Sequence, residues 1–203
     1  MSDTAPVSAP SPTRAALDAA VRRRYSEGAG RTVDALCCPT DYDPEVLAPI
    51  PAEVIERDYG CGNPTRHLQP GDTVLDLGSG TGKICFIASQ VVGAEGRVVG
   101  VDMNDDMLDV ARRAAPVVAE RTGCDNVTFL KGRIEDLKTD RAAADAWLRA
   151  HPVADESGLA ELERTLDQQR ETAPLVADDS VDVVVSNCVL NLVMPAAKRQ
   201  LFD

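Results

Sequence analysis

The chain has 203 residues, of which 44% are hydrophobic, an ordinary share for a protein that buries one core. Its 33 acidic against 21 basic residues and its 3% of aromatic residues argue against nucleic acid or an anionic membrane surface as a partner, because charge attraction and ring stacking would both be weak. No apolar run approaches the ~20 residues of a membrane span and the first residues lack a secretory signal, so we expect a cytoplasmic protein.

The number of cysteines is the unusual feature of this composition. No two of the six cysteines have the C-x-x-C spacing of a zinc ribbon or a thioredoxin-type redox pair. In a reducing cytoplasm they are expected to be thiols with packing or chemical roles. They are Cys37, Cys38, Cys61, Cys85, Cys124 and Cys188.

The N-terminal part of the chain is predicted to comprise a tail and then a segment of helices and loops over residues 14–71, called the lead below, which precedes the main domain. Residues 1–13 are mostly polar or small and rich in Pro, so they bury too little apolar surface to fold, and we expect a disordered tail. Within residues 14–71, Leu17, Val21 and Tyr25 recur at helical spacing, which predicts an amphipathic helix ended by the glycines that follow. The repeated prolines after it indicate loops with short helical pieces.

Residues 72–203 alternate strand and helix patterns. Asn104 is predicted to cap the second helix of this region, and Pro116 to kink or split it. Strand followed by helix is typical of βαβ units, so the predicted fold class is α/β with a parallel sheet. The predicted strands are 73–78, 96–102, 126–132 and 180–187.

The connection between the third and fourth strands, from about 138 to 177, is longer than a crossover needs. Its pattern predicts two helices, over 142–150 and 158–171. We interpret it as an inserted surface hairpin packed by Trp147 rather than as a functional lid.

A glycine-rich turn follows the first predicted strand. Asp76, Gly78, Gly80 and Gly82 form D-x-G-x-G-x-G, where glycines let a ligand approach the backbone and the next helix offers its N–H groups. Asp102 ends the second strand, where a carboxylate can accept both hydroxyls of a ribose or simply cap a helix. Turn and acid together favour a nucleoside-binding site.

The phrases VLDLGSGTG (74–82) and VGVDMN resemble the first two motifs of the class I S-adenosylmethionine-dependent methyltransferases. The resemblance implies a Rossmann-like fold and S-adenosylmethionine as cofactor. It places the loop from Gly78 to Gly82 along the methionine part of the cofactor, Asp102 on the ribose and Met103 against the adenine. Ile134 and Glu135 in KGRIEDL are placed at the adenine edge. Further candidates for cofactor contact are Tyr59, Asp76, Ser79 and Asn187.

Four phrases are similar to the arsenite methyltransferase family: YGCGNP (59–64), SNCVLNLV (186–193), VDMNDDML and CCP. The resemblance implies that Cys61 and Cys188 bind trivalent arsenic. It also implies that Cys37 or Cys38 forms a regenerating disulfide with Cys61, with a thiol reductant such as thioredoxin or glutathione as partner. The substrate would be arsenite or its thiol conjugates.

Elementary chemistry supports the same assignment. Ligands of an open α/β sheet bind outside the carboxyl ends of its strands, and Cys188 follows the fourth strand. Soft thiolates suit a thiophilic centre whose lone pair can take a methyl group without a general base. We expect Cys85 and Cys124 to be packing residues, because free cysteine is usually a small buried hydrophobe. Tyr25 is either a core residue or a cover over the cofactor.

Two departures from the family keep other functions open. The family has a short connection where this chain has the insertion, and the chain stops at Asp203, after the fourth strand, before the family's remaining strands and its third arsenic-binding cysteine. We therefore expect a C-terminally truncated methyltransferase. The alternatives are a methyltransferase for a small organic acceptor, and an incomplete fragment that binds cofactor or metalloid without turnover.

Overall fold

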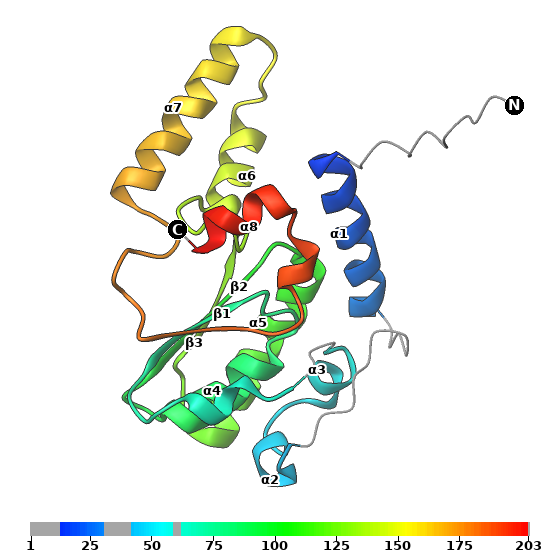
Figure 1. Cartoon of the computed structure of the whole chain (residues 1–203), viewed down its shortest axis with the longest axis vertical. Helices are drawn as coiled ribbons and strands as arrows, with labels where there is room; N and C mark the ends of the chain where they lie inside the picture. The colour runs from blue at the N-terminus through cyan, green and yellow to red at the C-terminus, as the bar shows by residue number, and fades with distance from the viewer. Residues whose placement is uncertain (1–12, 31–41, 59–61, 203) are drawn as a thin grey trace, which may run out of the picture.

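The computed structural model describes residues 13–30, 42–58 and 62–202 (Figure 1). Four residues singled out in the sequence, Cys37, Cys38, Tyr59 and Cys61, lie outside this part, as does almost all of the expected tail over 1–13. Among the described residues, no helix combines the length and apolar character needed to cross a bilayer.

The core of the fold is a parallel four-stranded sheet in the order β3-β2-β1-β4. Its strands are β1 (Thr73–Leu77), β2 (Arg97–Asp102), β3 (Val127–Lys131) and β4 (Val183–Ser186). The predicted α/β class with a parallel sheet is confirmed, as is the Rossmann-like arrangement. Because β2 and β4 pair with opposite sides of β1, the strand order reverses there, and a ligand site is expected beyond the carboxyl ends of these strands.

One face of the sheet is covered by α4 (Lys83–Val92) and α5 (Asp105–Thr122). Their apolar residues, with Phe86 and Leu108 fully buried, pack on the strands together with the short helices α2 (Pro44–Leu47) and α3 (Ala52–Glu56) of the lead. Asn104 caps α5 as predicted, since its side chain accepts from two backbone N–H groups of the first turn. Pro116 lies inside α5 without splitting it, so the predicted split was wrong, while the alternative of a kink stays a prediction.

The opposite face has a smaller apolar cluster formed by Leu75, Leu77, Val99 and Val101. It is covered by the segment around Leu175 and by α8 (Pro195–Phe202), which follows the 3-10 turn η3 (Leu190–Leu192). The other short turn, η2 (Pro64–His67), precedes β1.

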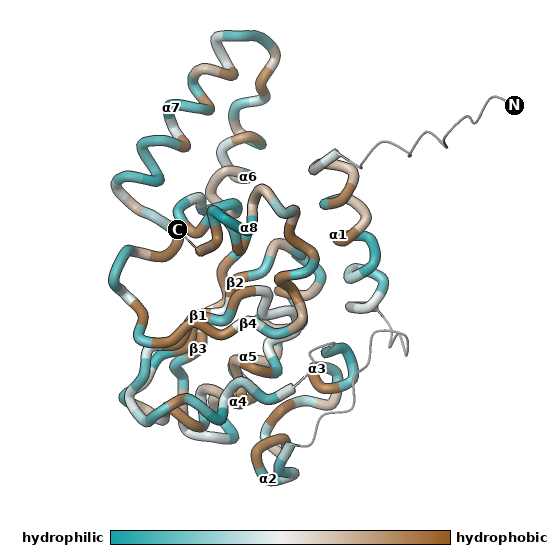
Figure 2. The backbone as a smooth tube through the Cα atoms, in the orientation of Figure 1, coloured by the Kyte–Doolittle hydropathy of each residue, from teal (hydrophilic) through white to brown (hydrophobic). Residues whose placement is uncertain are grey.

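The two helices predicted between β3 and β4 are present as α6 (Arg141–Ala150) and α7 (Glu156–Thr172). They project from the sheet as a hairpin (Figure 1), and α7 has no buried residue. Figure 2 shows that α7 is mostly hydrophilic, whereas hydrophobic residues gather along the strands. Trp147 stacks on His151 with ring centroids 4.7 Å apart.

The predicted N-terminal helix is α1 (Arg14–Gly30). It packs against α5 and is tied to it by Asn104, whose Nδ2 donates to the Arg22 carbonyl and to Ser26 Oγ, both at 3.2 Å. Through this contact α1 is held beside the carboxyl end of β2.

Candidate functional site

A cleft opens at the carboxyl ends of the strands, where the sheet topology predicts a ligand site. Every described residue that the sequence assigned to cofactor or substrate lines it, except Gly82. These residues are Asp76, Gly78, Ser79, Gly80, Asp102, Met103, Ile134, Glu135, Asn187 and Cys188. The fold therefore brings together four sequence segments that are separated by up to about a hundred residues.

Gly82 does not line the cleft and has a structural role, so its contact with the cofactor stays a prediction. It precedes α4 with φ +90°, and a Cβ there would stand 2.6 Å from Cζ of the Phe129 ring. The glycine thus lets β3 and the start of α4 approach each other closely.

Gly78 begins the loop that follows β1, and both its backbone angle and its close neighbour require a glycine there. Its φ is +80°, and a Cβ would stand 2.6 Å from Cγ1 of Val189, the residue after Cys188. The glycine therefore allows the segment after β4 to close against the loop after β1.

This contact gives a first prediction. Gly78→Ala should lower the free energy of unfolding by about 2 to 4 kcal/mol, because overpacking adds to the strain of a positive φ. Gly123→Ala is the matched control, since Gly123 has φ +74° but open space around its Cβ position, so it should lose only about 1 kcal/mol. Urea unfolding measures both. If Val189→Ala does not recover part of the loss in Gly78→Ala, the assigned clash is wrong.

Asp102 holds the loop and remains able to bind a ribose. Its Oδ2 accepts from the Gly80 N–H at 2.9 Å and its Oδ1 from the Asn104 N–H at 2.8 Å. Burial raises the pKa of Asp102, although these backbone donors oppose the shift. Since Asn104 caps α5, Asp102 is not the helix cap, and its carboxylate, with about four lone-pair positions, can still accept from a hydroxyl beside its backbone donors.

Asp76 lies beneath the same loop and is 2% exposed. Burial raises its pKa to about 7, and the hydrogen bond from Cys85 Sγ at 3.3 Å opposes the shift. Cys85 is fully buried, as expected of a packing thiol, whereas Cys124 is only half-buried.

A second wall of the cleft comes from α1, through Asp18, Val21, Arg22 and Tyr25. Of the two alternatives for Tyr25, its place in the cleft favours the cover over the cofactor. No sequence pattern marks Asp18 or Arg22 as cleft residues, because their position depends on contacts with residues about a hundred positions away.

The substrate end of the cleft contains Cys188, which is exposed and has φ +60°. A cysteine in the left-handed region is strained, and such strain is typical of functional positions held by their surroundings. Beside it, Asn187 Nδ2 donates to the Gly62 carbonyl at 3.2 Å, and the Tyr42 hydroxyl donates to the same oxygen at 2.5 Å.

Asp58, just before the undescribed residues 59–61, also lines the cleft. It forms an ion pair with Lys83, in which both side chains are almost fully buried, and Lys83 Nζ lies 4.8 Å from the centroid of the Tyr42 ring. Nothing in the sequence pattern predicted this pair. Within the described ranges, no three His, Cys, Asp or Glu side chains gather as a metal site.

The expected cofactor fits these residues. In the described part of the chain, the Ser79 Oγ is buried in the wall of the cleft with no hydrogen-bond partner, so it is available to a polar ligand. Asp102 offers acceptors for a ribose, and Met103, Ile134 and Met107 offer apolar surface for a base.

Comparison with known proteins points to the same chemistry. The family described as Methyltransferase domain matches residues 68–168. The arsenite methyltransferase of Aquipseudomonas alcaligenes is 39% identical over 160 residues, which are 77% of this chain and 36% of the relative. That of Homo sapiens is 34% identical over 151 residues, 73% of this chain and 31% of the relative. The chain thus spans about a third of the length of the curated relatives it matches.

A solved structure has the same arrangement. The arsenic(III) S-adenosylmethionine methyltransferase from Chlamydomonas reinhardtii superimposes with a TM-score of 0.53 at 31% identity, over 80% of this chain and 44% of that one. Because the sequence family, the curated relatives and the solved structure agree, the chain contains a methyltransferase domain of the class I S-adenosylmethionine-dependent fold, similar in sequence to arsenite methyltransferases.

Proposed function

We propose that this chain contributes the cofactor site and part of the acceptor site of an enzyme that methylates trivalent arsenic. The observation that carries the proposal is the position of Cys188, which lines the same cleft as the glycine loop and Asp102. A thiolate there can hold a thiophilic atom next to the bound cofactor. The names of the relatives support arsenic as that atom.

The residues that line the cleft differ in chemistry, and each would bind a different part of the cofactor or the substrate. S-adenosylmethionine, when bound, supplies a sulfonium methyl group that a lone pair can take. Asp102 would hold the ribose, Ile134 and Glu135 would flank the adenine, and Ser79 would meet the methionine part. Cys188 would hold the arsenic, with Cys61 as a second thiolate. The wall formed by α1 would exclude water from the reacting atoms.

The proposal also includes a step in which the cysteine thiols are regenerated after methyl transfer. Transfer of a methyl group onto the arsenic lone pair raises arsenic to the pentavalent level, and Cys61 with Cys37 or Cys38 would return it to the trivalent level by giving up two electrons as they form a disulfide. A thiol such as thioredoxin or glutathione would then reduce this disulfide. This chemistry suits the cytoplasm, where thiols are kept reduced.

Cys188→Ser tests the acceptor site. We expect it to weaken arsenite binding at least tenfold and to abolish methylated arsenic, because a hydroxyl is a poor ligand for a soft centre. Cys124→Ser is the matched control, since Cys124 does not line the cleft. Arsenite binding is measured by calorimetry and products by mass spectrometry after incubation with cofactor, thiol and arsenite. Arsenite binding equal to wild type in Cys188→Ser would contradict the proposal and favour an organic acceptor.

Cys188→Gly distinguishes the backbone strain at this position from the role of the thiol in arsenite binding. Glycine adopts φ +60° without a Cβ penalty, so this variant should gain about 1 kcal/mol in free energy of unfolding while it loses arsenite binding. Cys188→Ser keeps the Cβ and should show no such gain. Equal stability of the two variants in urea unfolding would exclude backbone strain at this position.

A further inference from the structure

We propose that the helical hairpin α6–α7 positions the wall of the cofactor cleft that receives the adenine, with Arg170 and Arg141 as positioning residues. The inference rests on the S-adenosylmethionine site of the proposed function and is independent of arsenic as the acceptor.

The wall in question is the segment after β3. Gly132, Arg133, Ile134 and Glu135 all line the cleft. The segment turns back at once, since the Asp136 N–H donates to the Arg133 carbonyl at 3.0 Å. A shift of Asp136 therefore moves Ile134 and Glu135, which lie between the two ends of this turn.

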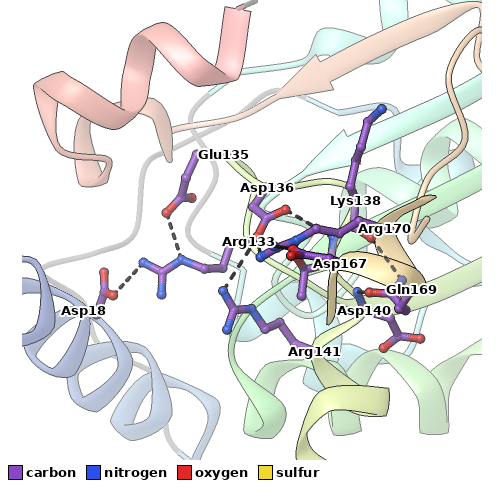
Figure 3. A network of polar contacts seen from close by, with 11 residues as sticks. Asp18, Arg133, Glu135, Asp136, Lys138, Asp140, Arg141, Asp167, Gln169 and Arg170 are labelled. Atoms are coloured by element: carbon purple, nitrogen blue, oxygen red, sulfur yellow. Dashed lines mark hydrogen bonds and ion pairs between the residues drawn. The ribbon is translucent and has the colours of Figure 1, made fainter. Parts of the chain in front are cut away.

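Asp136 is held by the base of the hairpin (Figure 3). Its Oδ2 lies 3.7 Å from Arg141 Nη2 at the start of α6 and 3.9 Å from Arg170 Nη2 near the end of α7. Its Oδ1 accepts from the Thr139 N–H at 3.2 Å. Arg170 Nε in turn donates to Thr139 Oγ1 at 2.8 Å, and Thr139 is fully buried. Both helices of the hairpin thus meet at one carboxylate behind the wall.

The neighbouring residue of α7 strengthens this connection. Gln169 Oε1 accepts from the Asp140 N–H at 3.1 Å, and its Nε2 donates to the Lys138 carbonyl at 3.1 Å. After α7, Leu175 packs so closely on Gly132 that a Cβ at the glycine would stand 2.3 Å from Leu175 Cδ2. The hairpin therefore contacts this segment at Asp136, Lys138, Thr139 and Asp140, and the residue Leu175 that follows it contacts Gly132.

The cleft side of the wall is held separately by α1. Arg133 Nη2 pairs with Asp18 at 2.5 Å and its Nε with Glu135 at 2.8 Å (Figure 3). The adenine wall is thus fixed from the cleft side by α1 and from the back by the hairpin. Loss of either support should leave the sheet folded and loosen the wall.

The experiment compares Arg170→Met with Arg164→Met, because Arg164 is exposed on the same helix. We expect Arg170→Met to weaken binding of both S-adenosylhomocysteine and 5′-methylthioadenosine about fivefold in calorimetry, since the second ligand lacks the amino-acid end and keeps the adenine. Arg164→Met should bind as wild type. The melting temperature and arsenite binding of Arg170→Met should stay at the wild-type values.

The outcomes of these binding measurements separate the possibilities. Asp136→Asn should show a similar loss, and the double variant should lose no more than either single one if the two residues act through one contact. Wild-type affinity in both Arg170→Met and Asp136→Asn overturns the proposal, as does a loss for S-adenosylhomocysteine alone. Failure of the wild-type chain to bind either ligand would overturn the cofactor site itself.

Discussion

Asp76→Asn should make the cofactor-free chain more stable at pH 8, by about 2 to 4 kcal/mol in free energy of unfolding. Burial raises the pKa of Asp76 to about 7 from an ordinary value of 3.8, so the folded state holds its proton to much higher pH than the unfolded state does. The stability linked to this proton is complete below about pH 4 and is lost as the pH rises through 7. About three pKa units at 1.36 kcal/mol each set the upper limit of the gain.

Asparagine removes this titration and can still accept from Cys85 Sγ. Urea unfolding at pH 5 and pH 8 should therefore show a smaller difference for Asp76→Asn than for wild type. Asp109→Asn, on the exposed side of α5, should keep the wild-type difference. Identical pH dependence in Asp76→Asn and wild type would contradict a raised pKa at this position. We expect the variant to bind cofactor more weakly, because a buried acid that lowers stability at neutral pH is typical of a functional position.

Local sequence patterns were sufficient to predict the strands and helices of the sheet domain and the candidate residues for cofactor binding that follow its first two strands. The strand, glycine turn and helix around VLDLGSGTG are specified within ten residues, and Asp102 follows directly from the end of its strand. The helix cap at Asn104 and both helices of the hairpin were likewise predicted from neighbours in sequence.

Contacts between distant segments could not be predicted in this way. Arg133 and Asp18 are 115 residues apart, so neither shows a pattern that marks it as part of a cleft. Gly82 matches the cofactor motif by spacing, yet its position is set by the Phe129 ring from another strand. The roles of Cys37, Cys38, Tyr59 and Cys61 stay predictions, since they lie outside the described residues.

The ion pair of Lys83 with Asp58 is the contact on which a single substitution should have the largest destabilising effect. Lysine in the first turn of α4 is unfavourable for the helix dipole, and its position is explained by Asp58. The side chains are 6% and 10% exposed, so Lys83→Met would leave a carboxylate buried without this cation. We expect a loss of about 3 to 5 kcal/mol in free energy of unfolding.

The matched control is Arg113→Met, which breaks an ion pair with Glu53 whose side chains are 62% and 43% exposed. That loss should be below about 1 kcal/mol, because solvent screens an exposed pair. Lys83→Met combined with Asp58→Leu should recover most of the stability, since removal of both members leaves neither charge of the pair buried without its partner. If the double variant unfolds as easily as Lys83→Met, then the contact of the lysine ammonium group with the Tyr42 ring, and not the charge of Asp58, accounts for the loss. Because Asp58 lines the cleft and lies just before Tyr59 and Cys61 in the sequence, the double variant should still bind arsenite more weakly than wild type even when its stability is restored.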